Sequence, residues 1–282
     1  MCTTCGCADL AQPRLTDLQT GRTTDLHAHP TTHDHHAHHH PSQNHDHGHE
    51  HHHGVDSHGD GTRIVLQEAV LAKNDRLAER NRGWLLAREV LALNLVSAPG
   101  SGKTTLLERT IRDLSGEIPM QVIEGDQETL QDAERISRTG CRVVQINTGA
   151  GCHLEADMVA KALERLAPSP RTIVMIENVG NLVCPALFDL GEQAKVAILS
   201  VTEGEDKPLK YPHMFRNAHV MLLNKIDLLP HLTFDVARCL HHARTVNPRL
   251  EIFLLSAFSG EGMQAWYDWL RQQVHRMDPM HP

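Results

Sequence analysis

A glycine-rich segment followed by a lysine and two threonines is the strongest chemical feature of this sequence. It reads SAPGSGKTT and occupies residues 97–105, after an apolar run and before a helical pattern. Strand, glycine-rich turn and helix form the context of a phosphate-binding loop, because several backbone N–H groups then point at one anion. The residues expected to bind phosphate are Gly100, Ser101, Gly102, Lys103, Thr104 and Thr105.

Two side chains of this loop have specific expected roles. Lys103 would reach the β- and γ-phosphates, and the Thr104 hydroxyl would bind Mg²⁺. One position departs from the usual pattern, because Ser97 stands where a phosphate-binding loop usually has its first glycine.

A second motif, Asn-Lys-Ile-Asp at residues 224–227, follows the apolar run 220–223 and predicts guanine recognition. The carboxylate of Asp227 can accept from both N1–H and the exocyclic amine of guanine, whereas adenine has no matching pair of donors. Asn224 and Lys225 complete the motif, and Lys225 can lie along the base. Ser256 and Ala257 end a later strand and resemble the Ser-Ala loop that directs backbone N–H groups at guanine O6.

Carboxylates at two other strand ends suggest the catalytic part of the site. Glu177 and Gly180 belong to Glu-Asn-Val-Gly, where most GTPases have Asp-x-x-Gly and the glycine N–H contacts the γ-phosphate. Asp126 ends another strand and could hold Mg²⁺ through water or position the attacking water. We interpret Lys103, Asp126 and Glu177 as catalytic, although each carboxylate could instead cap the next turn.

Thiols and imidazoles predict metal binding at two places. Cys2, Cys5 and Cys7 form C-x-x-C-x-C, which can wrap one soft or borderline metal ion, with a redox pair as the alternative. Cys152 and His153 are adjacent after one strand, and Cys184 would join them if two loops meet. Spacing alone leaves this second set balanced between a metal site and ordinary buried cysteine.

Histidines are concentrated in one internal tract. Residues 27–58 carry 15 of the 23 histidines, interspersed with Asp. Imidazole binds Ni²⁺, Zn²⁺, Cu²⁺ and Co²⁺, so we interpret the tract as a metal store or buffer, with a solvated linker as the alternative. Residues 8 to about 60 offer few apolar side chains, and we expect them to form no core.

The remaining chain predicts an α/β fold of the P-loop NTPase class. Short apolar runs occupy residues 91–97, 120–124, 142–146, 172–176, 195–201, 220–223 and 252–255, and helix-length segments separate them. This alternation predicts a mainly parallel sheet with helices on both faces and ligands at the carboxyl ends of the strands. We therefore expect a disordered Cys- and His-rich metal-binding tail over residues 1–60 and a P-loop GTPase domain over residues 61–282.

The composition limits the class of partner and compartment. The 282 residues carry a formal charge of −8, from 27 basic and 35 acidic side chains, which gives no reason to expect nucleic acid. No apolar run is long enough to span a bilayer, and the N-terminus lacks the pattern of a signal peptide, so we expect the cytoplasm. There, the seven cysteines would be thiols or metal ligands rather than disulfides.

Taken together, these motifs resemble the HypB family of hydrogenase nickel-incorporation GTPases. The resemblance rests on CTTCGC, the histidine tract, SAPGSGKTT, EGD, GAGCHL, ENVGNLVCP and NKID, which run through nearly the whole chain. The serine form of the phosphate loop fits this family. Urease and cobalamin accessory GTPases share the Glu of Glu-x-x-Gly, and they are the alternative enzyme class; a nickel store with a vestigial nucleotide site is the non-enzyme alternative.

The resemblance implies specific ligands, activity and partners. It implies nickel at Cys2, Cys5 and Cys7, and zinc or nickel at Cys152, His153 and Cys184. It also implies GTP binding, slow GTP hydrolysis to GDP, and a homodimer whose formation depends on nucleotide. The implied partners are a HypA-type accessory metallochaperone and the hydrogenase large subunit, which receives the nickel.

Overall fold

The computed structural model describes residues 13–26 and 59–277, with side chains from residue 68 onward in the first helix. Its strands are β1 (Arg14–Asp17), β2 (Thr23–Asp25), β3 (Leu91–Ser97), β4 (Met120–Asp126), β5 (Arg142–Asn147), β6 (Ile173–Glu177), β7 (Ala194–Ser200), β8 (Val220–Asn224) and β9 (Glu251–Leu254). Its helices are α1 (Gly59–Ala87), α2 (Lys103–Leu114), α3 (Gln131–Ser137), α4 (Ala156–Leu166), α5 (Cys184–Leu187), α6 (Lys207–Lys210), α7 (Pro212–Arg216), the 3₁₀ helix η1 (Ile226–His231), α8 (Val236–Val246) and α9 (Met263–Arg276).

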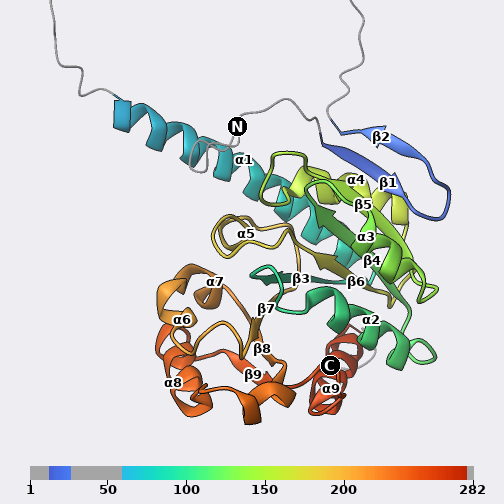
Figure 1. Cartoon of the computed structure of the whole chain (residues 1–282). Coiled ribbons are helices and arrows are strands. Elements are labelled where there is room, and N and C mark those ends of the chain that lie inside the picture. The colour runs from blue at the N-terminus through green and yellow to red at the C-terminus, as the bar shows by residue number, and fades with distance from the viewer. Residues whose placement is uncertain (1–12, 27–58, 278–282) are drawn as a thin grey trace, which may run out of the picture.

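All the described strands form one sheet in the order β2-β1-β5-β4-β6-β3-β7-β8-β9 (Figure 1). The strands from β3 to β9 pair in parallel, which confirms the predicted P-loop NTPase fold. β3 lies between β6 and β7. Since parallel strands end at the same edge, the loops after β3, β4, β6 and β8 open onto one side of the molecule.

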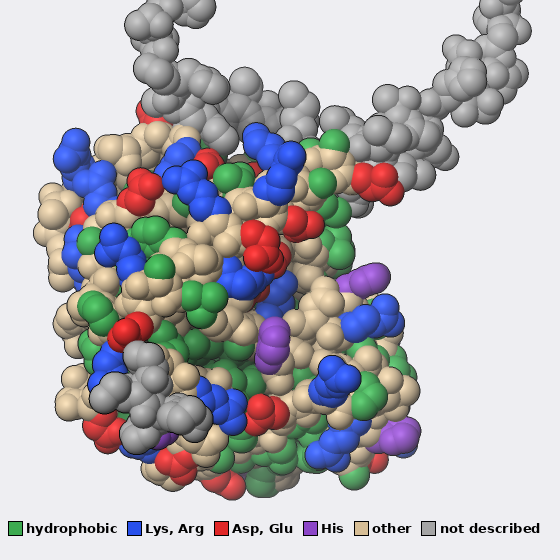
Figure 2. Space-filling model, turned by 180° about the vertical axis from the view of Figure 1, so that it is seen from behind, with side chains coloured by type: hydrophobic (Ala, Val, Ile, Leu, Met, Phe, Trp, Pro, Cys, Tyr) green, Lys and Arg blue, Asp and Glu red, His purple; other side chains and the backbone are tan. Residues whose placement is uncertain are grey.

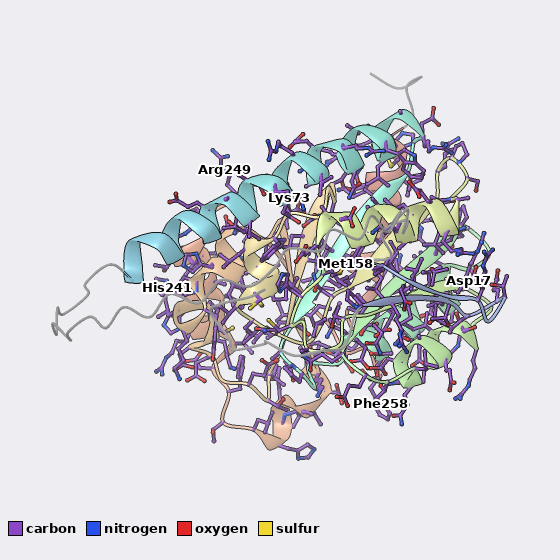
Figure 3. All side chains as sticks on the ribbon, turned by 90° about the horizontal axis from the view of Figure 1, so that it is seen from above. Asp17, Lys73, Met158, His241, Arg249 and Phe258 are labelled. Atoms are coloured by element: carbon purple, nitrogen blue, oxygen red, sulfur yellow. The ribbon has the colours of Figure 1, made fainter. Side chains whose placement is uncertain are left out.

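Alternating side chains of β3 belong to different cores. Leu93 and Leu95 pack in a cluster with α2, α3 and α9 on one face. Ala92 joins a cluster with α1 and α4 on the other face, and Val96 joins a cluster with α7 and α8. Figure 3 shows α1 lying across the molecule beside α4, on which Met158 is labelled. Successive side chains of a strand point to opposite faces of the sheet, so each face packs against its own layer of helices.

The N-terminal hairpin corrects one sequence-based expectation. We expected residues 8–60 to form no core, which is wrong for residues 13–26. β1 pairs antiparallel with both β2 and β5, and Leu15 and Leu26 are buried against the sheet. The signal in the sequence was weak, because strands of four and three residues carry few apolar positions and depend on pairing with β5.

Charge is mixed on the surface. On the face that Figure 2 shows, Lys and Arg side chains are interspersed with Asp and Glu, without a large area of one sign. Among the described residues, no helix has both the length and the apolar character that a membrane crossing needs.

Candidate nucleotide and metal sites

The phosphate-loop sequence forms a tight turn between β3 and α2. Gly100 and Gly102 have positive φ values of 75° and 95°, and Gly102 is the residue before the first turn of α2. A Cβ atom at Gly102 would lie 2.6 Å from Asn224 Nδ2, so only glycine fits there. The buried Lys103 Nζ donates a hydrogen bond to Ser97 Oγ at 3.0 Å, which gives the serine a role that glycine could not fill.

Thr104 and Glu177 join the phosphate loop to the end of β6. The Thr104 hydroxyl donates to Glu177 Oε1 at 2.8 Å, and Glu177 is only 3% exposed. Burial raises the pKa of Glu177, and the nearby Lys103 cation and the Thr104 hydrogen bond only partly offset this rise. The other carboxylate oxygen, Oε2, is buried and has no hydrogen-bond partner among the described residues.

Lys103, Thr104 and Glu177 line one cleft of about 530 Å³. Asp126 lines it too, and its carboxylate accepts hydrogen bonds from the backbone N–H groups of Gln127 and Thr129. The resulting turn precedes α3, which begins at Gln131. Asp126 therefore closes a turn, as the alternative interpretation held, while it also faces the cleft.

Gly180 and Lys225 complete the walls of the cleft from two other loops. A Cβ atom at Gly180 would lie 3.2 Å from Pro99 Cγ and 3.3 Å from Pro99 Cα, so the loop after β6 packs directly on the phosphate loop. Lys225 Nζ donates to the carbonyl oxygen of Gly100 at 2.6 Å. Three loops thus converge on the same space.

The Asn-Lys-Ile-Asp and Ser-Ala segments meet as predicted. Asn224 Nδ2 donates to the carbonyl oxygen of Ser101 at 2.9 Å, and Asn224 Oδ1 accepts from the Ala257 N–H at 3.0 Å. Ser256 is fully buried beside Ala257. Asp227 Oδ1 is buried without a hydrogen-bond partner in the part of the chain that the structure describes. An unpaired buried acceptor is costly, so this atom is available for a ligand donor.

Cys152, His153 and Cys184 come together, which the sequence alone did not decide. One ligand atom from each lies within 4.8 Å of the others, and all three residues are buried. The imidazole of His153 stacks on Phe188 with ring centroids 3.9 Å apart. Burial lowers the pKa of His153 to about 4, so the ring is neutral near pH 7, as a metal ligand must be.

The donor set fits a soft or borderline ion. Two thiols and a neutral imidazole match Zn²⁺ or Ni²⁺ better than Mg²⁺ or Ca²⁺, which prefer oxygen. Three protein donors also leave a coordination position open for exchange. The predicted ligands Cys2, Cys5 and Cys7, and the histidine tract, lie outside the described residues.

Two other cysteines belong to no group of metal-ligating side chains among the described residues. Cys141 and Cys239 are buried in different hydrophobic clusters. Burial raises the pKa of each thiol to about 12, which makes both unreactive.

Sequence reasoning missed two buried polar residues beside the site. Glu124 pairs in register with Glu177 across β4 and β6, and burial, together with the Glu177 charge, raises its pKa to about 9. Asn178 Oδ1 accepts from the Leu154 N–H at 3.3 Å, and its Nδ2 donates to Asn94 Oδ1 at 3.1 Å. Asn94 gave a signal, because it is a polar residue inside an otherwise apolar strand.

Known proteins share this fold and these motifs. Residues 91–254 match the CobW/HypB/UreG nucleotide-binding domain. The chain is 63% identical over 204 residues to hydrogenase maturation factor HypB of Escherichia coli (strain K12), covering 72% of this chain and 70% of that protein. HypB of Rhizobium leguminosarum bv. viciae is 58% identical over 213 residues, with 76% of this chain and 71% of that protein covered.

Solved structures of HypB proteins have the same fold as this chain. The crystal structure of HypB from Archaeoglobus fulgidus superposes with a TM-score of 0.68 at 40% identity, covering 72% of this chain and all of that one. HypB from Helicobacter pylori in complex with nickel gives a TM-score of 0.68 at 36% identity, covering 72% of this chain and 96% of that one.

The parallel sheet and the glycine-rich cleft at its carboxyl edge define a P-loop nucleotide-binding protein. Within that class, the chain belongs to the HypB hydrogenase maturation factors of the CobW/HypB/UreG family. The resemblance inferred from the motifs is confirmed.

Proposed function

We propose that this chain is a GTP-hydrolysing nickel metallochaperone that helps to insert nickel into the large subunit of a [NiFe]-hydrogenase. One observation carries the proposal: the segment from Glu177 to Cys184 belongs to both sites. Its first part lines the nucleotide cleft, and Cys184 lies beside Cys152 and His153. A change at the phosphates can therefore reach a metal ligand within a few residues.

We propose that Asp227 makes the nucleotide site specific for guanine. Its buried Oδ1 would accept from guanine, and adenine would leave it unpaired. Asn224 would hold the phosphate loop and the Ser-Ala loop in register, through its bonds to Ser101 and Ala257. Lys225 would cover the base.

Hydrolysis is proposed to depend on Mg²⁺ and four side chains. Thr104 would bind the ion through its hydroxyl, and Lys103 would neutralise the β- and γ-phosphates. Asp126 and Glu177 would orient water around the ion, and Gly180 would contact the γ-phosphate through its N–H. Mg²⁺ supplies charge neutralisation on the phosphates. These motifs contain no candidate arginine finger and no candidate glutamine to orient water, so we expect the intrinsic rate of GTP hydrolysis to be slow.

The Cys152, His153 and Cys184 site is proposed to hold zinc or nickel, and Cys2, Cys5 and Cys7 to load nickel. Support comes from the HypB structure solved in complex with nickel, which this chain resembles at 36% identity. Loss of the γ-phosphate would relax Gly180 and shift Cys184, so the GTP and GDP forms would hold metal with different affinity. By linkage, metal would change nucleotide affinity by the same factor.

The expected partners follow from the family. We propose a nucleotide-dependent homodimer, a HypA-type accessory metallochaperone and the hydrogenase large subunit, acting in the cytoplasm. The half-buried Leu228 and Leu229 and the exposed Leu232, at 39%, lie just after the guanine motif and could belong to the dimer contact.

The test combines metal and nucleotide measurements on one protein. Ni²⁺ and Zn²⁺ would be titrated into the intact chain with GDP and with a non-hydrolysable GTP analogue, and GTP turnover would be measured in parallel. A Cys2→Ala/Cys5→Ala/Cys7→Ala variant that also lacks the histidine tract isolates the second site. We expect this variant to keep GTP turnover and one nucleotide-sensitive metal site.

Two results would contradict the proposal. One identical metal affinity in both nucleotide forms would remove the coupling. A protein that binds nickel without any GTP turnover would instead be a nickel store, and Lys103→Ala serves as the negative control for turnover.

A further inference from the structure

A lysine is buried beneath the helix that carries Cys184. Lys195 lies on β7 and is 6% exposed. Its Nζ donates to the carbonyl oxygens of Pro185 at 3.3 Å, Ala186 at 3.4 Å and Phe188 at 3.2 Å. The three N–H donors of one ammonium group thus bind three carbonyl oxygens, two within α5 and one on the residue after it. Carbonyl groups at a helix end have no partner within the helix, so this cation satisfies them.

The charge of Lys195 is balanced by a carboxylate that is also buried. Glu192 Oε1 lies 3.7 Å from Lys195 Nζ, and Glu192 is 7% exposed. The same oxygen accepts from Asn94 Nδ2 at 3.0 Å, and Glu192 Oε2 accepts from the Leu190 N–H at 2.7 Å. A buried ion pair contributes little net stability compared with apolar side chains of the same size, so its presence calls for another explanation.

The hydrogen bonds continue from this pair to the other metal-ligand loop. Asn94 Oδ1 accepts from Asn178 Nδ2, and Asn178 Oδ1 accepts from the N–H of Leu154, the residue after His153. One buried chain of polar contacts therefore begins at α5, which carries Cys184, and ends next to His153.

The aromatic contact reinforces the same geometry. Lys195 holds the carbonyl of Phe188, and the ring of Phe188 stacks on His153 at 3.9 Å between centroids. Cys184 and His153 are therefore both tied to Lys195, the first through the backbone of α5 and the second through Phe188.

We propose that Lys195 is a positioning residue for the metal site, holding α5 where Cys184 faces Cys152 and His153. This inference rests on the proposed metal binding by those three residues. Lys195 does not contact the ion; it fixes the backbone that presents one thiol and the ring that supports the imidazole. Without it, the carbonyls of Pro185 and Phe188 would turn toward other donors, while Ala186 would keep the hydrogen bond from Asn217 Nδ2, and α5 would shift.

The test uses Co²⁺ as a spectroscopic probe on the full chain with the Cys2→Ala/Cys5→Ala/Cys7→Ala background. Thiolate-to-cobalt charge transfer then reports a thiolate site, which the imidazoles of the histidine tract cannot mimic, and the d–d bands report the coordination geometry of the bound Co²⁺. Lys195→Met keeps the length of the side chain and removes the donors. We expect Co²⁺ affinity to fall at least tenfold and the d–d bands to change, with GDP affinity within about twofold of the parent.

A second variant separates positioning from stability. In Lys195→Met/Glu192→Gln no buried charge is left unpaired, so most of the lost stability should return while the carbonyls of Pro185 and Phe188 still lack the donor that Lys195 supplied. We expect Co²⁺ binding to stay weak in this double variant. Cys239→Ala, a buried change in another cluster, controls for a general loss of packing and should leave the spectrum unaltered.

The outcomes distinguish the positioning role of Lys195 from the proposed metal binding by Cys152, His153 and Cys184. If Lys195→Met keeps both the spectrum and the affinity, or if the double variant recovers them along with its stability, Lys195 has only a structural role. If Cys184→Ser in the same background leaves the thiolate–cobalt band intact, the metal site itself is wrong.

Discussion

Replacing Asn224 by alanine should weaken both the fold and nucleotide binding, because this side chain joins two loops of the site. Its Nδ2 donates to the Ser101 carbonyl and its Oδ1 accepts from the Ala257 N–H. Asn224, Ser101 and Ala257 are 1%, 1% and 5% exposed, so water cannot readily replace either bond.

The size of the effect follows from the two groups left unpaired. Each buried donor or acceptor without a partner costs about 1–3 kcal/mol, so Asn224→Ala should lower the free energy of unfolding by roughly 2–6 kcal/mol. The phosphate loop would also lose its fixed position, and we expect GDP affinity to fall at least about tenfold, or about 1.4 kcal/mol.

Urea unfolding with and without GDP measures both quantities. At a GDP concentration of about 100 times the parent Kd, the parent should gain roughly 2.7 kcal/mol and the variant only about 1.4 kcal/mol. Asn247→Ala is the matched control, because its Nδ2 donates to the carbonyl oxygens of Phe215 and Ala218 away from the cleft. It should lower stability and leave the GDP effect unchanged. An Asn224→Ala protein with the parent's GDP affinity would refute this reasoning.

Three further changes test the other parts of the site. Asp227→Asn replaces an acceptor by an amide, so guanine affinity should fall at least about a hundredfold and xanthine nucleotides should gain relative to guanine nucleotides, as measured by competition binding. The pKa of Glu124 is raised to about 9 from an ordinary value of 4.5. Between these pH values the folded state keeps the Glu124 proton and the unfolded state loses it, so the free energy of unfolding of the parent falls as the pH rises. Between pH 5 and pH 7.5 this loss is of the order of 3 kcal/mol, and Glu124→Gln should remove that dependence in urea unfolding; equal slopes would contradict it. Cys184→Ser should lower the Zn²⁺ affinity of the Cys152, His153 and Cys184 site at least about tenfold and leave the GDP affinity of the metal-free protein unchanged, and isothermal titration would show both.

The fold was largely predictable because its signals are local. Every parallel strand includes a short apolar run, and the segments between the strands are long enough for crossover connections. The hairpin over residues 13–26 was not predictable in this way. Its two buried leucines, Leu15 and Leu26, gain their environment from β5 and α4, which are far away in the sequence.

The site was predictable where one motif carries one function. The phosphate loop, Asn224 and the Ser-Ala segment meet as their order implied. The distance between Cys184 and Cys152 was not predictable, because it depends on how two loops fold over the sheet. The positions of Lys195 and Glu192 were hidden for the same reason: a charged residue in a sequence does not reveal that it will be buried.

The order of the strands explains why the glycine-rich cleft and the cluster of Cys152, His153 and Cys184 share one segment. β6 and β7 lie on either side of β3, so the chain between them must pass β3 to reach its next strand. The first part of this crossover meets the phosphate loop, where Gly180 packs against Pro99. The next part is α5, which β7 holds from beneath through Lys195. Cys184 on α5 therefore lies between the contact of Gly180 with the phosphate loop and the contacts of Lys195, and any movement at Gly180 must be taken up near Cys184.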